Sequence, residues 1–261
     1  MIRARKRFGQ HFLHDPGVLA RIVAAVAPQP GEHIVEIGPG PGALTAQLLA
    51  AVPDIDAVEI DRDLAAALRE RWPHSLRLHE GDALRFDFTQ LAAARGGPLR
   101  LVGNLPYNIS TPLLFHFLEH RAAVRDLTVM LQKEVVERMA AAPGSGDYGR
   151  LTVMLAPWFD IEHVFDVGPG AFHPPPRVWS AVAHLTVLAQ PRFALPDAWA
   201  EVVARAFSQR RKTLRNSLRG LVDAAGWEAS GIDAGQRPEQ LHPEQFATLA
   251  AQVVMPINAA R

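Results

Sequence analysis

Residues 99–107 hold the side chains best suited to chemistry in this sequence. An apolar run at residues 99–102 ends at a glycine and is followed by a polar and aromatic group: Asn104, Leu105, Pro106 and Tyr107. This pattern predicts a buried strand that stops at the rim of a sheet, where open α/β sheets bind their ligands. The Asn104 amide oxygen and a backbone carbonyl near Pro106 can accept both hydrogens of an exocyclic amine, while the Tyr107 ring offers a stacking face. These residue types predict a pocket for adenine.

A strand-end turn is the simpler interpretation of the same tetrapeptide. Asn and Pro are ordinary turn formers, and Tyr is an ordinary half-buried aromatic residue. The four residues alone are a short match, so the rest of the chain must decide between a turn and a pocket.

A glycine-rich turn lies upstream of that motif. Residues 33–37 predict a strand that leads directly into Gly38–Gly42, where glycine and proline alternate, and a helix follows. Glu59, near the end of a second predicted strand at 55–60, follows the turn by roughly twenty residues and suits ribose hydroxyls. These features predict a nucleotide-type site. A tight turn without a ligand is the weaker alternative, because three glycines weaken local order unless a close backbone approach requires them.

The two prolines in this turn bear on the choice of ligand. A loop that binds pyrophosphate uses backbone N–H groups, and Pro39 and Pro41 have none. A dinucleotide is therefore disfavoured, and a ligand that carries adenosine without phosphate is favoured. S-adenosylmethionine is such a ligand.

Two further residues each have a functional and a structural interpretation. Asp82, in the turn after a predicted strand at 75–79, can accept a hydrogen bond from the adenine amine of a cofactor or can cap the turn. Phe172 lies in a proline-rich loop at residues 170–178, where it can stack on the substrate base or can plug the core beneath the loop. Local sequence does not separate these alternatives.

The remaining pattern alternates strands and helices, which predicts an α/β fold with a mostly parallel sheet. Further strands are expected at 127–131, 159–167 and 181–188, the last two as an antiparallel pair that finishes the sheet. Helices are expected at 15–27, 61–71, 111–119, 132–142 and 151–156. A smaller helical region begins near residue 190, with helices at 199–207, 212–224 and 244–254. Residues 10–13 are expected to be extended, as a basic arm that leads into the first helix.

Length and composition limit the function classes. With 261 residues, 48% of them hydrophobic and 21% charged, the chain suits one large domain and a smaller one. It has no cysteine, which excludes disulfides and thiolate metal sites, and its 11 histidines form no ligand spacing, so no metal is expected. No apolar run reaches the ~18 residues of a membrane span, and the basic N-terminus leads to no apolar signal core. We therefore expect a cytoplasmic protein that does not enter a membrane.

Cations gather in one segment although the net charge is zero. Residues 205–219 contain no acid, and they carry Arg205, Arg210, Arg211, Lys212, Arg215 and Arg219. Arg211, Arg215 and Arg219 recur at helical spacing and are predicted to form one stripe. A solvated helix face is the usual interpretation of such a run. In a chain without net charge, contact with a phosphate backbone explains the concentration better.

An ordered set of motifs links the sequence to a known family. The motifs are Gln10–Leu13, Glu36–Gly42, Glu59, Gly81–Ala83, Asn104–Tyr107 and Phe172–Val178. Together they closely resemble the ribosomal RNA adenine N6-dimethyltransferases, and the likeness runs almost from end to end. Residues 207–214 resemble the bacterial branch that acts on small-subunit rRNA.

The resemblance implies a fold, a reaction and partners. The fold is an α/β, Rossmann-like, seven-stranded S-adenosylmethionine-dependent methyltransferase sheet with a small all-α C-terminal domain. Residues 1–189 would form the methyltransferase domain, and residues 190–261 a helical domain that assists rRNA recognition. The reaction dimethylates N6 of two adjacent adenosines in the 3′-terminal hairpin of 16S rRNA, within the small ribosomal subunit or its precursor. A monomer is expected.

The resemblance also assigns site residues by position. The implied catalytic residues are Asn104, Leu105, Pro106, Tyr107 and Phe172. The implied cofactor-binding residues are His11, Leu13, Gly38, Gly40, Glu59, Asp82 and Asn104. The implied rRNA-binding residues are Arg210, Arg211, Lys212 and Arg215. Many members have Asn where this chain has His11, and positions 173 and 179 vary within the family.

Two other classes of function compete with this interpretation. One is a ribosome-assembly factor that docks on RNA without catalysis, against which the complete Asn104–Tyr107 motif speaks. The other is a nicotinamide-dependent oxidoreductase, which the two prolines of the glycine-rich turn disfavour.

Overall fold

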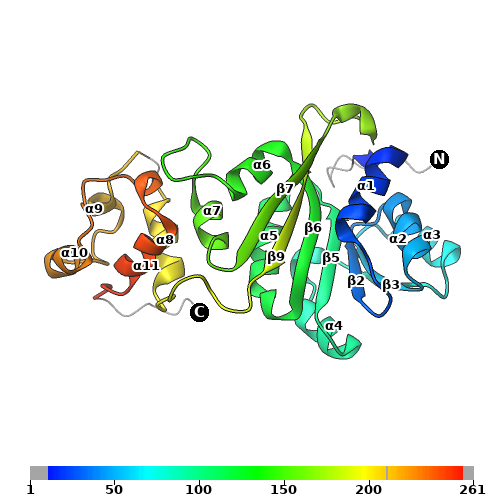
Figure 1. Cartoon of the computed structure of the whole chain (residues 1–261), viewed down its shortest axis with the longest axis horizontal. Helices are drawn as coiled ribbons and strands as arrows, with labels where there is room; N and C mark the ends of the chain where they lie inside the picture. Colours follow the sequence, from blue (N-terminus) through cyan, green and yellow to red (C-terminus); the bar gives the residue numbers. More distant parts are fainter. Residues whose placement is uncertain (1–10, 210, 255–261) are drawn as a thin grey trace. The chain divides into compact units, whose positions relative to one another are not determined.

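The computed structural model describes residues 11–209 and 211–254, and within them the chain forms two compact units (Figure 1). The first unit comprises the described residues up to Val136 together with Ile161–Val187. The second comprises Glu137–Asp160 and the described residues from Leu188 onward. The basic N-terminus at residues 1–7, Gln10 of the first motif and Arg210 of the basic segment lie outside the described residues.

The first unit contains a seven-stranded sheet in the order β4-β3-β2-β5-β6-β9-β7 (Figure 1). Its strands are β2 (His33–Ile37), β3 (Ile55–Glu59), β4 (Leu76–Glu80), β5 (Leu99–Asn104), β6 (Val124–Gln132), β7 (Phe159–Val167) and β9 (Ser180–Val187). Strands β2 to β6 run parallel, and β9 is antiparallel to β6. The predicted Rossmann-like sheet of seven strands is confirmed.

The strand order reverses beside β2, and that reversal locates the site. From β2 the chain moves outward to β3 and β4, and then returns to place β5 on the other side of β2. The loops after β2 and β5 therefore leave the same edge of the sheet in opposite directions and open a crevice. The glycine-rich turn follows β2, and the Asn104–Tyr107 motif follows β5.

Successive strand residues point to opposite faces of the sheet, and apolar residues on both faces are buried. Ile34 packs in a core cluster with Leu19 of α1 and Leu48 of α2, whereas neighbouring Val35 lies outside that cluster and is equally buried. The helices of this unit are α1 (Pro16–Val26), α2 (Ala43–Ala51), α3 (Arg62–Arg71), α4 (Phe88–Arg95) and α5 (Ser110–Glu119), followed by α6 (Lys133–Met139), which continues past the unit boundary. Three single 3₁₀ turns are η2 (Ala83–Arg85), η3 (Arg121–Ala123) and η4 (Pro169–Ala171).

Helix α4 was not predicted. It begins after Asp87, whose side chain accepts a hydrogen bond from the Gln90 N–H, and it buries Phe88, Leu91 and Ala92. The i, i+3, i+4 spacing of these apolar residues was the available signal. The Phe88 ring lies edge-on to Phe117 of α5, with 5.5 Å between ring centroids.

A second, two-stranded sheet joins segments that are far apart in the sequence. β1 (Phe12–Leu13) pairs antiparallel with β8 (Phe172–His173), with Phe12 opposite His173 and Leu13 opposite Phe172. Residues 11–13 are thus extended as predicted, but they form a strand against the proline-rich loop. No local pattern identifies such a distant partner.

The second unit has a separate core that includes a segment expected in the first domain. The hydroxyl of Tyr148 donates to the Leu241 carbonyl at 2.7 Å, and Val153 of α7 (Arg150–Leu155) packs in one cluster with Trp199 and Phe246. These buried contacts explain why residues 137–160 belong with the second unit. The expected division into 1–189 and 190–261 placed them in the first domain.

The C-terminal part of the second unit is helical, but one predicted helix is wrong. Its helices are α8 (Trp199–Ala206), α9 (Leu214–Ser217), α10 (Ala224–Ser230) and α11 (Pro243–Ala250), with a 3₁₀ turn η5 (Pro238–Gln240). Within the helix expected at 212–224, only the four residues of α9 are helical before α10 begins at Ala224. The chain leaves the helical conformation by Gly220, where φ is +80°, and the backbone N–H groups of Leu214 and Arg215 bond to carbonyls at 236 and 234 instead.

Arg100 anchors the beginning of β5 in the first unit. Its Nε donates to both carboxylate oxygens of Asp126 at 3.0 Å, its Nη1 to Glu32 at 2.5 Å and its Nη2 to the Val26 carbonyl at 2.7 Å. At the other end of the strand, the Leu105 N–H donates to the carbonyl of residue 130 in β6 at 3.0 Å. The strand that carries the Asn104 motif is therefore held at both ends.

Replacing this buried cation should destabilise the fold strongly. Arg100→Met leaves the carboxylate of Asp126, which is 5% exposed, without its main partner, and we expect a loss of about 3–5 kcal/mol in unfolding free energy. Urea unfolding measures this loss. Arg125→Met is the matched control, because its side chain is 58% exposed and pairs with Glu32 at the surface, so it should change stability by about 1 kcal/mol or less. Equal losses for the two variants would contradict the role given to Arg100.

Candidate functional site

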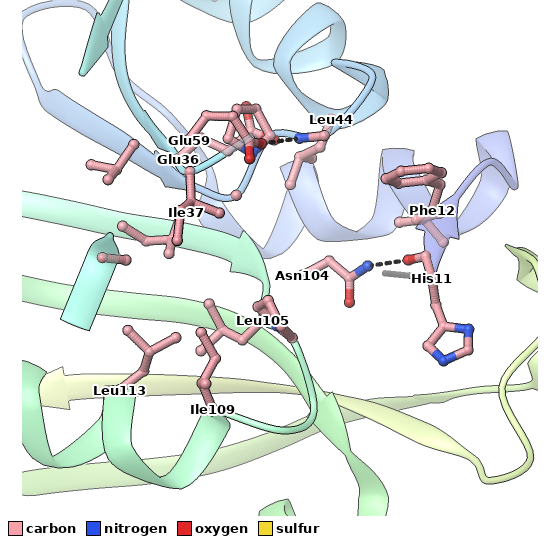
Figure 2. Close-up of a pocket in the computed structure, with 18 of the residues that line it drawn as sticks. His11, Phe12, Glu36, Ile37, Leu44, Glu59, Asn104, Leu105, Ile109 and Leu113 are labelled. Carbon is pink, nitrogen blue, oxygen red and sulfur yellow. Dashed lines mark hydrogen bonds between the residues drawn. The ribbon is translucent and has the colours of Figure 1, made fainter. Parts of the chain in front are cut away.

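A cavity of about 200 Å³ opens at the carboxyl ends of β2, β3 and β5 (Figure 2). It brings together ten of the residues assigned from the sequence: His11, Leu13, Gly38, Gly40, Glu59, Asp82, Asn104, Leu105, Pro106 and Tyr107. They come from five separate segments of the chain, and all belong to the first unit. The cavity is therefore complete within that unit.

The glycine-rich turn forms one wall, and its N–H groups are already used within the protein. The Gly38 N–H donates to the Val58 carbonyl at 2.9 Å, the Gly40 N–H to Glu59 Oε2 at 3.0 Å and the Gly42 N–H to the Pro39 carbonyl at 3.0 Å. The remaining two residues of the turn are prolines, which have no N–H. Residues 38–42 therefore offer no N–H to a phosphate, which strengthens the case against a dinucleotide.

Gly38 is also the point where the backbone faces open space. Its φ is +65°, a conformation that L side chains rarely adopt, and no heavy atom lies within 4 Å of the position that a Cβ would take. A ligand in the cavity can therefore approach the backbone closely at this residue.

Glu59 is held in a fixed orientation at the end of β3. Its Oε2 accepts the Gly40 N–H at 3.0 Å and its Oε1 accepts the Asp61 N–H at 2.9 Å. Burial raises the pKa of this carboxyl, although the N–H donors at residues 61 and 40 oppose the rise. Each carboxylate oxygen has two lone pairs, so Glu59 can still accept ribose hydroxyls.

Glu36 is a second acidic residue at the site, and it received no role from the sequence. It lies in β2, is 2% exposed, and accepts a hydrogen bond from the Thr45 hydroxyl at 2.6 Å. Burial raises its pKa to about 8; the Thr45 bond opposes this rise, and the charge of Glu59 adds to it. Figure 2 shows Glu36 and Glu59 on the same side of the cavity. A charged residue inside an apolar strand was the signal that could have identified it.

The charge of the lining indicates what kind of ligand fits. The carboxyl groups of Glu36, Glu59 and Asp82 line the cavity, and the lining contains no Lys or Arg within the described part of the chain. Asp82 also caps η2, since its Oδ1 accepts the Leu84 N–H at 2.9 Å, and this leaves its second oxygen for a ligand. Asp82 can therefore cap the turn and accept a hydrogen bond from a ligand at the same time. The sulfonium and ammonium charges of S-adenosylmethionine fit this acidic lining, and the phosphates of a dinucleotide do not.

Asn104 presents its amide oxygen away from the N-terminal strand. Its Nδ2 donates to the His11 carbonyl at 2.9 Å (Figure 2). A backbone carbonyl only accepts hydrogen bonds, so the amide cannot turn its oxygen toward His11. The Asn104 Oδ1 is therefore directed elsewhere, as a substrate amine requires.

Tyr107 is oriented by two residues from distant parts of the chain. Its hydroxyl shares a 2.6 Å hydrogen bond with the Ser180 hydroxyl, and the His11 ring stacks on it with 5.5 Å between centroids and 28° between planes. His11 is itself bonded through Nδ1 to the Pro174 carbonyl at 2.7 Å. Ser180 is fully buried, and nothing in its local sequence marked it as part of the site.

Phe172 does not reach the cavity. It is 2% exposed and belongs to the hydrophobic core of the first unit, where it lies opposite Leu13 in the two-stranded sheet. Of the two interpretations of Phe172, the structure supports the hydrophobic plug. We therefore correct the assignment of Phe172 to a second stacking face, because its pairing with β1 turns the ring into the core.

The basic segment is exposed, but it does not form the predicted stripe. Arg211 and Lys212 lie in a turn, Arg215 lies in the four-residue α9, and Arg219 lies beyond it. All four are exposed, and the described part of the chain places no carboxylate within ion-pair distance of them. The expected charge concentration remains, on a bent segment rather than on one helix face.

Within the described residues, no group of three or more His, Asp or Glu side chains lies close enough to hold a metal ion. The same residues contain no helix with the length and apolar character needed to cross a membrane.

Comparison with known proteins gives the site its context. The family model described as ribosomal RNA adenine dimethylase matches residues 1–253. Ribosomal RNA small subunit methyltransferase A from Pseudomonas putida is 53% identical over 255 residues, covering 96% of this chain and 95% of that protein. The protein of the same name from Aromatoleum aromaticum is 57% identical over 250 residues, covering 95% and 93%.

Solved structures show the same fold. A dimethyladenosine transferase from Plasmodium falciparum is 26% identical, with a TM-score of 0.75, and the match covers 92% of this chain and 96% of that one. The 23S rRNA methyltransferase ErmE is 28% identical, with a TM-score of 0.68, and covers 94% of this chain and 100% of its own.

Removing the carboxylate of Glu59 should weaken cofactor binding. Glu59→Ala removes a charge-assisted hydrogen bond to ribose worth roughly 1.5–3 kcal/mol, which corresponds to about 10- to 150-fold in Kd. Calorimetry with S-adenosylmethionine measures this change. Glu70→Ala on exposed α3 is the control and should bind as the wild type does. Unchanged affinity in the Glu59 variant would refute the ribose contact.

The raised pKa of Glu36 predicts a pH dependence of stability. Below about pH 4.5 the carboxyl is protonated in both the folded and unfolded states; between about 4.5 and 8 only the folded state keeps the proton. Stability should therefore fall as pH rises through this window, by up to about 1.4 kcal/mol per pH unit from this group. Urea unfolding at several pH values measures the slope. Glu36→Gln should flatten it, and the same slope in both proteins would contradict the prediction.

Proposed function

Since the chain belongs to the ribosomal RNA adenine dimethylase family, we propose that it dimethylates N6 of two adjacent adenosines in the 3′-terminal hairpin of 16S rRNA. The observation that carries this proposal is the fixed amide of Asn104 beside Tyr107, at the mouth of an acidic cavity. Adenine requires an acceptor for its amine and a stacking face, and these two residues supply both.

The cofactor is S-adenosylmethionine, which supplies a methyl group on a sulfonium leaving group. We assign Glu59 to its ribose hydroxyls and Asp82 to its adenine amine. Gly38 permits close approach of the ligand to the backbone, while Gly40 holds Glu59 in place through its N–H. Leu13 contributes apolar lining. His11 acts through its carbonyl on Asn104 and through its ring on Tyr107.

The chain's own residues prepare the substrate amine for attack. The N6 lone pair is delocalised into the adenine ring, so proximity alone is insufficient. We propose that Asn104 Oδ1 and the Pro106 carbonyl accept the two amine hydrogens and draw N6 toward tetrahedral geometry as the new bond forms. The Pro106 carbonyl already accepts the Ile109 N–H at 3.1 Å, and its second lone pair is directed to the substrate. The alkylated nitrogen then loses its proton to water, so no strong base is required.

The second unit is proposed to assist rRNA recognition through the basic segment. Arg211, Lys212 and Arg215 are exposed cations, and Arg210, assigned with them, lies outside the described residues. We propose that the chain acts as a monomer, because every residue of the cavity comes from one unit of one chain. We further propose a cytoplasmic location, where bacterial ribosomal RNA is found.

Methyl transfer with modification mapping tests the proposed function. The purified protein is incubated with small subunits that lack these methyl groups and with labelled S-adenosylmethionine, and the modified nucleotides are mapped. We expect two neighbouring N6-dimethyladenosines near the 3′ end. Subunit binding without transfer would support a non-catalytic assembly factor. Tight NADH binding without S-adenosylmethionine binding would support an oxidoreductase.

Tyr107 should be required for transfer and not for cofactor binding. Tyr107→Ala removes a stacking contact worth about 1–3 kcal/mol per base and the orientation of the substrate ring, so we expect methylation to be largely lost. Tyr107→Phe keeps the ring and loses only the bond to Ser180, and it should retain more activity. Initial rates and calorimetric affinity for S-adenosylmethionine separate the two effects. Near-normal methylation by the alanine variant would rule out stacking.

Charge reversal tests the basic segment. Arg211→Glu with Arg215→Glu should lower affinity for rRNA and flatten its salt dependence by on the order of 0.7–0.9 per lost phosphate contact. Subunit binding across a salt titration measures both effects. Reversal of Arg62 and Arg69 in α3 is the control with the same change in net charge. If the basic-segment variant and the wild type gave equal affinities and parallel slopes, the segment would be only a solvated surface.

A further inference from the structure

Trp179 is the most exposed large hydrophobic side chain of the described residues, with 56% of its surface accessible. Neighbouring Val178 is 42% exposed. Single exposed hydrophobic residues are common on proteins. Trp179 differs from such residues in its position and in its contacts.

Trp179 lies at the edge of the sheet where the substrate site opens. β5 and β6 are parallel and β9 is antiparallel to β6, so the start of β9 meets the ends of β5 and β6 at one edge. The Lys133 N–H, just after β6, donates to the Trp179 carbonyl at 3.0 Å. Asn104 is level with residue 130 of β6 and residue 182 of β9, so Trp179 lies two strands across and three residues further along. That is about 10 Å in each direction and about 14 Å from Asn104 in all. The next residue, Ser180, bonds directly to the Tyr107 hydroxyl.

The backbone of Trp179 is fixed, and its indole lies beside a neighbouring loop. Its backbone is fixed by the Lys133 bond and by Ser180, which is fully buried. Three carbons of its six-membered ring lie 3.7–4.0 Å from the position that a Cβ on Gly168 would occupy. The six-membered ring therefore lies close to Gly168, and its large exposed fraction leaves the remainder open to solvent.

Arg177, two residues before Trp179, is a cation available to a phosphate. Arg177 is exposed, and the part of the chain that the structure describes places no carboxylate within ion-pair distance of it. Lys133 and His163 both contact the carboxylate of Asp166, at 2.6 and 2.7 Å. Glu134 follows Lys133 in the sequence.

We propose that Trp179 is a stacking surface for an rRNA nucleotide that flanks the target adenosine, with Arg177 beside it for a phosphate. This inference rests on the proposed function. An exposed aromatic face beside a cation is the arrangement that binds unpaired bases without reading their sequence. The separation of about 14 Å from Asn104 places this base outside the pocket that holds the target.

Three variants test the proposal in the full-length enzyme. Trp179→Ala should lower kcat/KM for unmethylated small subunits by at least about 5-fold, the lower limit expected for one lost base stack. Trp179→Phe keeps an aromatic face and should restore most of the loss. Val254→Ala truncates another exposed hydrophobic residue, 54% accessible and in the second unit, and should match the wild type. Calorimetric affinity for S-adenosylmethionine should be unchanged in all three.

Filter binding to deproteinised 16S rRNA identifies the partner. Weaker binding of Trp179→Ala to the naked RNA supports a nucleotide. A loss confined to intact subunits would assign Trp179 to a ribosomal protein and overturn the proposal, as would a phenylalanine variant as impaired as the alanine variant. If the wild-type enzyme transferred no methyl group, the proposed function would be rejected. The comparison of binding to naked rRNA would still test the stacking surface.

Discussion

The amide of Asn104 can present either its oxygen or its nitrogen to a substrate, and the carbonyl of His11 decides between them. Because that carbonyl only accepts hydrogen bonds, it accepts one from the Asn104 Nδ2 at 2.9 Å, and the amide oxygen stays available for the amine of the proposed substrate. The choice depends on residues that are far apart in the sequence. Residues 11–13 are in place because they pair with 172 and 173, and β5 is in place because Arg100 and Leu105 hold its two ends.

The acidic lining of the cavity also depends on which polar groups are already hydrogen-bonded within the protein. The glycine-rich turn directs its N–H groups to Val58, Glu59 and Pro39, so it orients a carboxylate instead of binding an anion. Glu59 is thereby held in one orientation. The raised pKa of Glu36 limits the number of buried negative charges near it when no ligand is present. A cationic ligand relieves the remaining repulsion, which makes this cavity selective for S-adenosylmethionine over a phosphate-bearing nucleotide.

The substrate side of the site is assembled by the antiparallel end of the sheet. β9 runs against β6, and this direction brings Ser180 to Tyr107 and Trp179 to the same edge. A wholly parallel sheet would place the start of that strand at the opposite edge. The reversed strand therefore allows the proline-rich loop, the turn at Asn104–Tyr107 and the N-terminal strand to meet.

Several features were predictable because they depend on neighbours in the sequence. Apolar periodicity predicted the strands and most helices of the first unit, and the prolines at 39 and 41 predicted a loop unable to bind phosphate. The ordered motifs predicted ten residues that the structure brings to one cavity. Other features depend on tertiary contacts. Arg211, Arg215 and Arg219 have helical spacing, but backbone bonds to residues 234 and 236 hold this segment in a different path.

Local sequence also could not place Phe172, Ser180 or residues 137–160. The pairing of Phe172 with Leu13 turns an aromatic ring into the core, and the hydroxyl of Ser180 gains its role only when β9 lies beside β6. Tyr148 draws its segment into the second unit through a bond to Leu241. The sequence by itself determined the chemical groups and the elements that carry them, because periodicity and turn chemistry are local. Only the tertiary structure decided which face each side chain presents, because burial and hydrogen-bond partners are set by contacts between residues far apart in the sequence, such as the 163 positions that separate His11 from Pro174.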